Sequence, residues 1–220
     1  MAMSTGEQFT SAPVYQQLRA RILEGSEEPG SALTESAVSL RFSVARPTAK
    51  LAIERLVAEG LLLREAHRAA RVPQFGRADI IDLYNSRAII ESAAIGALAT
   101  GGTIPAEALA AHRSLLARVA AGAGYTSEDI AFHRFLVTGQ TSTRLARIHG
   151  MLMGEIELCI GQLKSHHLRH GGDIADEHQG ILNALVAGDA DLASARTLDH
   201  TYKSRDRILA RFDLDHPEGN

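Results

Sequence analysis

The sequence predicts a mainly α-helical protein in which three short helices and a small β-hairpin are followed by an all-α antiparallel helical bundle. Apolar residues recur at helical spacing from Val14 onward, and two short runs between residues 61 and 73 are predicted to be strands. Beyond residue 78 the pattern is helical to the end of the chain. At 220 residues the chain exceeds a typical single domain, so we expect two compact units.

Each of the first three helices is bounded by residues that favour helix starts and stops. The first is expected from Val14 to Glu24, and the second from Thr34 to about Phe42 with Thr34 as its N-cap. The third has Pro47 in its first turn and ends at Glu59-Gly60.

The hairpin is expected to join strands at residues 61–64 and 70–73 through residues 65–69. Two short helices separated by a tight break, followed by a hairpin, form the order of elements of a winged helix-turn-helix. In that arrangement the second helix of the pair enters the DNA major groove, and the hairpin is the wing.

The remainder should contain about six helices, with breaks at Gly101-Gly102, residues 121–125, Gly171-Gly172 and Gly188-Asp189. We therefore divide the chain into five parts. These are a disordered tail (1–12), a winged helix-turn-helix (13–73), a linker (74–78), a helical domain (79–213) and a flexible tail (214–220).

Composition indicates an ordinary globular protein, with 45% hydrophobic and 22% charged residues. The net charge of -3 argues against indiscriminate nucleic-acid binding, but it is unevenly distributed. Residues 1–76 carry a net charge of +1 and residues 77–220 a net charge of -4, which permits DNA contact by the first unit.

The single cysteine, Cys159, cannot form an internal disulfide and suggests a reducing compartment. The N-terminal residues lack the basic and apolar regions of a secretion signal, and no apolar run reaches the length of a membrane helix. We therefore expect a cytoplasmic protein that does not span a membrane.

Basic residues lie at the start of the third helix, where a recognition helix would meet DNA. Arg46 and Lys50 are four residues apart and share a face, with Thr48 between them. Arg68 and Arg71 in the wing could reach the DNA backbone or minor groove. Spacing alone equally allows Arg46 and Lys50 to be solvated charges on a surface helix.

Four segments of this unit resemble the GntR family of bacterial transcription regulators. They are Pro29-Gly30, Leu33-Thr34-Glu35, Val44-Ala45-Arg46-Pro47-Thr48-Ala49-Lys50 and Ala58-Glu59-Gly60-Leu61. The resemblance implies a homodimer that binds double-stranded operator DNA, with repression the expected output. The DNA-binding residues it implies are Thr34, Ser36, Arg46, Thr48, Lys50 and Arg68.

The sequence departs from the GntR pattern at three places. Ala45 stands where a capping Ser or Thr is usual, and Ser43 replaces the usual turn glycine. The wing tip, Arg68-Ala69-Ala70, also lacks a glycine. We therefore expect Arg46 and Lys50 to contribute more to DNA binding than Arg68.

A possible metal site lies in the second half. Asp129 and His133 are four residues apart on one helix, and His178 and His200 lie on later helices that could fold back against it. One carboxylate and three imidazoles suit zinc, nickel or another divalent transition metal. An Asp and a His at this spacing are, however, more often an ordinary surface pair.

Residues 79–212 resemble the FCD ligand-binding domain of one GntR subfamily, through Asp129-Ile130-Ala131-Phe132-His133, Glu177-His178 and His200. The resemblance implies that Asp129, His133, His178 and His200 bind a divalent metal. It also implies that Arg87 holds the carboxylate of a small organic acid effector. The alternative for Arg87 is an ion pair with Glu91 on the same helix.

The other histidines do not match this motif. We expect the cluster His166, His167 and His170 to be at the surface and His112 to face solvent, whereas His149 could face the pocket.

The function that these patterns predict is a ligand-responsive transcription regulator that is not an enzyme. Two alternatives remain open from the residues. A metal-dependent hydrolase would need a general base, and the neighbouring carboxylate, Glu177, should point about 100° away from the ligand His178. A regulator that senses only the metal is the other alternative.

Overall fold

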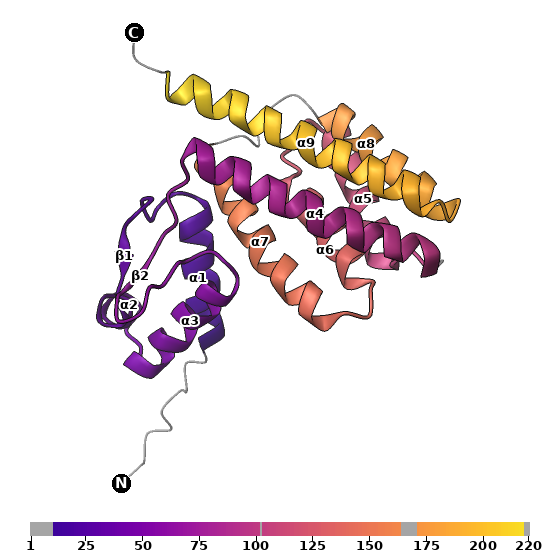
Figure 1. Ribbon diagram of the computed structural model, residues 1–220. Helices are drawn as coiled ribbons and strands as arrows, with labels where there is room; N and C mark the ends of the chain where they lie inside the picture. The colour runs from indigo at the N-terminus through magenta and orange to yellow at the C-terminus, as the bar shows by residue number, and fades with distance from the viewer. Residues whose placement is uncertain (1–10, 102, 164–170, 218–220) are drawn as a thin grey trace. The chain divides into compact units, whose positions relative to one another are not determined.

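The structure is a computed structural model that describes residues 11–101, 103–163 and 171–217. The chain divides between Gln74 and Phe75 into two compact units. Figure 1 shows the elements of each unit.

The described residues of the first unit, from residue 11 onward, form three helices and a two-stranded antiparallel sheet. In chain order the elements are α1 (Ser11–Leu23), β1 (Ala32–Leu33), α2 (Glu35–Phe42), α3 (Arg46–Ala58) and β2 (Ala70–Arg71). The three helices predicted from the sequence are confirmed. Their apolar faces meet in a core whose fully buried members include Leu18, Ile22, Val38, Ile53 and Leu56.

The turn between α2 and α3 shows the consequences of two sequence departures. Ser43, at the end of α2, adopts a left-handed conformation with φ of 52°, which a glycine would adopt without strain. Ala45 precedes α3 without a side-chain cap, whereas Thr34 caps α2 by accepting a hydrogen bond from Ala37 N at 3.1 Å. The start of α3 therefore relies on Pro47 rather than on a capping hydroxyl.

The wing differs from the predicted hairpin. β2 pairs mainly with β1, in the register Ala32 to Arg71 and Leu33 to Ala70, and residues 61–64 contribute only the bridge between Leu63 and Arg71. A strand presents hydrogen-bonding groups on both edges, so β2 can take partners on two sides. The two-residue strand β1 was missed because it is too short to show any periodicity.

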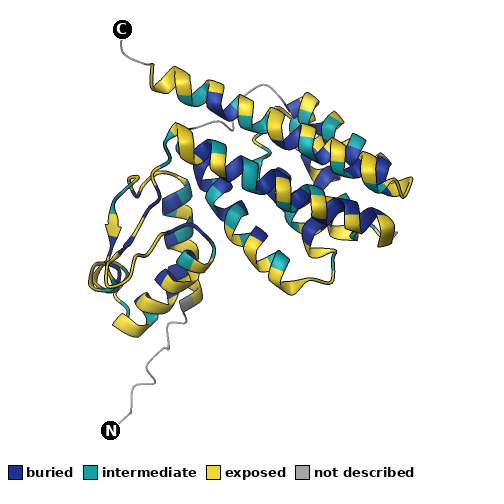
Figure 2. Ribbon diagram, viewed as in Figure 1, coloured by how far each residue is buried: buried dark blue, intermediate teal, exposed yellow. Residues whose placement is uncertain are grey.

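The second unit contains six described helices. They are α4 (Arg77–Gly101), α5 (Ala106–Ala120), α6 (Thr126–Thr138), α7 (Thr143–Gln162), α8 (Gly171–Val186) and α9 (Ala190–Asp215). α4 and α9 lie side by side along much of their length (Figure 1). Buried residues form stripes on the facing sides of the helices, with exposed residues on the outer sides (Figure 2).

One helix break was missed and one was misplaced. α6 and α7 are separated at residues 139–142, where Ser142 caps α7 by accepting from Leu145 N at 3.2 Å. Gly171 and Gly172, expected at a break, are instead the first residues of α8. α9 continues to Asp215, beyond the end expected near Arg211.

None of the described helices alone has the length and apolar composition of a membrane span, although α4 and α5, bent by 118°, meet the criteria as a pair.

Candidate functional site

Three helices of the second unit bring together the four residues expected to bind metal. Asp129 and His133 lie one turn apart on α6, His178 is on α8 and His200 is on α9. All four are buried, and one ligand atom from each lies within 4.8 Å of the others. The expectation that later helices fold back against α6 is therefore met.

The spacing of these atoms is close to that of ligands around one ion. Nε2 of His133 lies 3.0 Å from Nε2 of His200 and 3.8 Å from Oδ1 of Asp129, and Nε2 of His178 lies 3.2 Å from the same oxygen. Ligand atoms about 2.0–2.2 Å from a zinc ion are separated by about 3 to 3.6 Å when they are neighbours in a tetrahedral or octahedral shell. Two of the three distances fall within that range, and all four ligand atoms lie within 4.8 Å of one another, so the side chains would have to move slightly closer to enclose an ion.

The polar groups of the cluster also require a partner. Among the residues that the structure describes, Oδ1 of Asp129 and Nε2 of His178 are buried atoms without a well-aligned hydrogen bond. Buried polar atoms are rarely left in that state. A divalent ion would satisfy both atoms, so the donor set fits a metal.

Burial keeps two histidines of the cluster, His133 and His178, neutral. It lowers the pKa of His133 to about 4 and that of His178 to about 3, and the charge of Arg87 contributes to the shift at His133. Burial would raise the pKa of Asp129, but its contacts with His178 and nearby positive charge outweigh that effect and lower the pKa below its usual range. Neutral imidazole and ionised carboxylate are the forms that bind metal.

Glu91 on α4 connects the cluster to a buried charge network. Its Oε2 lies 2.8 Å from Nδ1 of His133, and its Oε1 lies 2.8 Å from Nε2 of His149 and accepts from Nε of Arg87 at 3.0 Å. Burial would raise the pKa of Glu91, but Arg87 and His133 lower it well below its ordinary value. Glu91 is thus an ionised carboxylate that joins α4, α6 and α7.

Arg87 forms the ion pair with Glu91 that the sequence offered as the alternative to effector binding. It is 1% exposed, and its Nε contacts Glu91 four residues along α4. Its Nη2 is nevertheless buried without a hydrogen-bond partner among the described residues. The ion pair therefore leaves one donor of the guanidinium free for a ligand.

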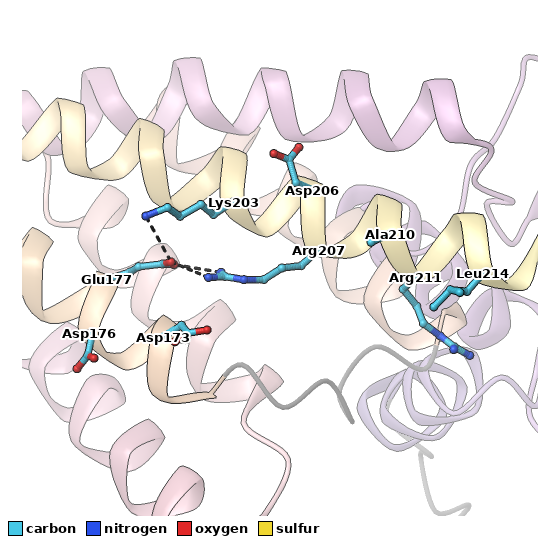
Figure 3. A pocket seen from close by; sticks show the side chains of 9 residues that line it. All are labelled: Asp173, Asp176, Glu177, Lys203, Asp206, Arg207, Ala210, Arg211 and Leu214. Atoms are coloured by element: carbon cyan, nitrogen blue, oxygen red, sulfur yellow. Dashed lines mark hydrogen bonds and ion pairs between the residues drawn. The ribbon is translucent and has the colours of Figure 1, made fainter.

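Glu177 on α8 is the second carboxylate, after Glu91, that contacts a histidine of the cluster from outside. It lines an open groove with residues of α9, and Figure 3 shows its carboxylate directed toward Lys203 and Arg207. Its Oε2 also accepts from Nδ1 of His200 at 2.8 Å. Glu177 contacts the nitrogen of His200 that faces away from the cluster.

The remaining histidines differ in how well they were anticipated. His112 is 4% exposed on α5, and its ring lies 5.9 Å from that of His178, so the expectation that it faces solvent was wrong. It was misjudged because a single helix does not reveal which face another helix will cover. His149 is buried against Glu91. His166, His167 and His170 lie outside the described residues.

The candidate DNA-binding residues of the first unit all retain some exposure. Thr34, Ser36, Arg46, Lys50 and Arg68 are exposed, and Thr48 is partly buried. Nζ of Lys50 lies 3.7 Å from Oε1 of Glu54, and Nη1 of Arg68 lies 3.0 Å from Oε2 of Glu65. These exposed pairs can be exchanged for contacts with DNA phosphates at little cost, since surface ion pairs contribute little.

Two family models match the chain. The model described as "Bacterial regulatory proteins, gntR family" covers residues 10–72, and the model described as "FCD domain" covers residues 82–202. Together they account for the winged unit and for most of the helical unit.

Known relatives match over nearly the whole length. A protein of Paenarthrobacter nicotinovorans, named as a probable repressor of a D-xylose utilization operon, is 24% identical over 204 residues, covering 90% of this chain and 89% of the relative. The transcriptional repressor GlaR of Escherichia coli is 25% identical over 211 residues, covering 87% and 92%. A crystal structure described as a GntR transcriptional regulator, from Rhodococcus sp. RHA1, has a TM-score of 0.71 at 25% identity and covers 91% of this chain and 97% of the other.

Sequence reasoning missed the outer partners of the metal cluster. Glu91, His149 and Arg207 were not proposed in those roles, and Glu177 was considered only as a general base. Glu91 was visible only as a possible partner of Arg87, and the adjacency of Glu177 to His178 concealed that it contacts His200. Such contacts join helices far apart in sequence, so spacing along one helix cannot reveal them.

Proposed function

The chain belongs to the GntR family of bacterial regulatory proteins, carries an FCD domain and is a DNA-binding transcriptional regulator; from this we propose that it is a repressor whose helical unit binds a small carboxylate beside a divalent metal ion. The supporting observation is the convergence of Asp129 with three buried histidines on one point. Zinc is the first candidate for the ion, and nickel is the second.

The charge of the cluster favours an anionic effector. Asp129 and Glu91 are negative and Arg87 is positive, so a bound divalent ion leaves the buried region with one excess positive charge. A buried charge without compensation is costly. A monocarboxylate that contacts both the ion and Nη2 of Arg87 would remove the excess and satisfy the unpaired donor.

The regulatory mechanism that we propose is a population shift in a cytoplasmic homodimer. Two copies of α3 would contact the half-sites of a pseudo-palindromic operator, with Arg46 and Lys50 toward the DNA and Thr34, Ser36, Thr48 and Arg68 as further contacts. The effector would favour an arrangement of the dimer with lower operator affinity. It can do so only if it binds the two arrangements with different affinity.

The test is metal analysis of the purified protein followed by thermal unfolding with a series of small carboxylic acids, each with and without a chelator. We expect bound metal, and we expect stabilisation by at least one monocarboxylate that disappears with the metal. The His178→Ala variant is the matched control, because it removes a ligand that is not in contact with Arg87 or Glu91. Stabilisation by metal with no response to any acid, together with operator binding that follows metal concentration, would instead favour a regulator that senses the metal itself.

A further inference from the structure

Glu177 is held from two sides on the outside of the metal cluster. Its Oε2 accepts a hydrogen bond from Nδ1 of His200 at 2.8 Å and another from Nη1 of Arg207 at 3.1 Å. Its Oε1 accepts from Nη2 of Arg207 at 2.6 Å. Arg207 therefore donates to both oxygens of the carboxylate (Figure 3), and Oε2 also accepts from the imidazole of His200.

This arrangement determines which nitrogen of His200 carries hydrogen. An ionised carboxylate can only accept, so the hydrogen bond favours the tautomer of His200 that carries hydrogen on Nδ1. Nε2 then carries the lone pair, and Nε2 is the atom that lies 3.0 Å from Nε2 of His133 inside the cluster. The hydrogen bond also fixes the rotation of the ring.

Arg207 keeps the carboxylate in place. It lies seven residues after His200, which places both side chains on the same face of α9, two turns apart. Lys203 lies between them on that face, with its Nζ 3.9 Å from Oε1 of Glu177. The two positive charges favour ionised Glu177 and oppose its rotation away from His200.

We propose that Glu177, clamped by Arg207, is a positioning residue of the metal centre that holds His200 in the metal-binding tautomer and so sets the affinity for the ion. The inference rests on the proposed function, because it requires that the cluster bind a metal. It extends that function to two residues that do not contact the ion. Glu91 stands in a similar relation to His133, but it also neutralises buried Arg87, so Glu177 is the partner that can be changed with less damage to the core.

The experiment measures zinc affinity of the metal-free, full-length protein by competition with a chromogenic chelator. Glu177→Gln keeps the size of the side chain but replaces one acceptor by an amide donor. With its single oxygen held by Arg207, the amide would present hydrogen to Nδ1 and favour the tautomer with hydrogen on Nε2. We expect zinc affinity to fall about 10- to 100-fold, the usual effect of losing such a partner.

Two further variants test whether the effect depends on the position of the Glu177 carboxylate or only on its negative charge. Asp176→Asn removes the same charge from the preceding residue of α8, also on the groove, and should bind zinc as the wild type does. Arg207→Met removes only the clamp and should cause a smaller loss than Glu177→Gln. The absorption spectrum of bound Co²⁺ should change in Glu177→Gln, whereas a loss of general stability would leave that spectrum unaltered.

The outcomes distinguish the inference from the function on which it rests. Wild-type affinity in Glu177→Gln, beside normal binding in Asp176→Asn, overturns the role of Glu177 and leaves the metal site standing. Weaker binding with an unchanged Co²⁺ spectrum and a lower melting temperature of the metal-free variant also overturns it, because the effect is then one of stability. If the wild type and Asp176→Asn both fail to bind zinc or cobalt, the proposed function itself fails.

Discussion

Nε2 of His133 and Nε2 of His200 face each other at 3.0 Å, although the two residues lie on α6 and α9 and are 67 residues apart. The outer nitrogen of each ring lies 2.8 Å from a carboxylate, Glu91 for His133 and Glu177 for His200. Nδ1 of His200 donates to its carboxylate, and the same tautomer of His133, with hydrogen on the Nδ1 beside Glu91, would direct a second lone pair at the same point. Lone pairs at that distance repel each other unless a proton or a cation lies between them, so the arrangement favours a bound ion.

Metal binding should stabilise the protein by a predictable amount. A ligand that binds only the folded state at 100 times its dissociation constant adds about 2.7 kcal/mol to the free energy of unfolding. We expect zinc to raise the melting temperature of the metal-free protein, and we expect His178→Ala to lose that increase. Scanning calorimetry with and without chelator measures the melting temperatures. An equal increase in the variant would show that zinc binds elsewhere.

The metal-free protein should become less stable as the pH falls below about 6.5. His133 and His178 have folded pKa values of about 4 and about 3, whereas an unfolded histidine has a pKa of about 6.5. Between these values the unfolded chain binds protons that the folded chain does not, so each histidine removes about 1.4 kcal/mol of stability per pH unit as the pH decreases. The lowered pKa values of Asp129 and Glu177 act in the same direction at lower pH.

Urea unfolding of the metal-free protein at a series of pH values from 7.5 to about 5 measures this slope. His178→Gln should reduce the slope, because one of the two protons is then absent in both states. A free energy of unfolding that does not change over this range would contradict the assignment of buried, neutral histidines.

The extent to which sequence predicted this site follows from the range of its interactions. Asp129 and His133 were found because their chemistry and their spacing lie on one helix, and His178 and His200 were added through the family motif. The partners Glu91 and Glu177 depend on which helices pack together, and no local pattern specifies that. The same limit explains His112, whose burial depends on how α5 packs against α6 and α8.

The prediction of the fold had the same limit, because local signals were recognised and long-range pairings were not. Three helices of the first unit carry strong start and stop residues, and their existence could be inferred from Thr34, Pro47 and Gly60. The break between α6 and α7 was overlooked although Gly139 and Ser142 signal it, since neither is accompanied by a proline or a charged cluster. The pairing of β1 with β2 joins segments almost forty residues apart and leaves no periodic trace.

The buried pair of Arg87 and Glu91 should be strongly coupled. Both side chains are at most 1% exposed, so Arg87→Leu leaves an uncompensated carboxylate in the interior. We expect a loss of about 3 to 5 kcal/mol in the free energy of unfolding. Arg87→Leu combined with Glu91→Gln should recover part of that loss, because the buried charge is then removed.

A double-mutant cycle with urea unfolding measures the coupling. The exposed pair of Arg77 and Asp213, which also joins two helices, is the control, and Arg77→Met should cost less than about 1 kcal/mol. Additive effects of the Arg87 and Glu91 changes would mean that the two residues do not form an ion pair in solution.

The DNA-binding prediction concerns two cations on one face of α3. Arg46 and Lys50 are both exposed, and Arg46 is at the first residue of the helix, where a recognition helix meets base edges. If Arg46 reads a base, Arg46→Ala should weaken discrimination between operator and altered operator by about 1 to 3 kcal/mol. If Lys50 contacts a phosphate, Lys50→Ala should weaken binding to all sequences. It should also reduce the slope of log affinity against log salt concentration by about one.

Competition gel shifts at several salt concentrations separate these effects. Arg55→Ala is the control, because Arg55 also lies on α3 but forms an ion pair with Glu59. Unchanged affinity and selectivity in the Arg46 variant would remove that residue from the base-reading set, and the exposed charges of α3 would then be solvated surface residues.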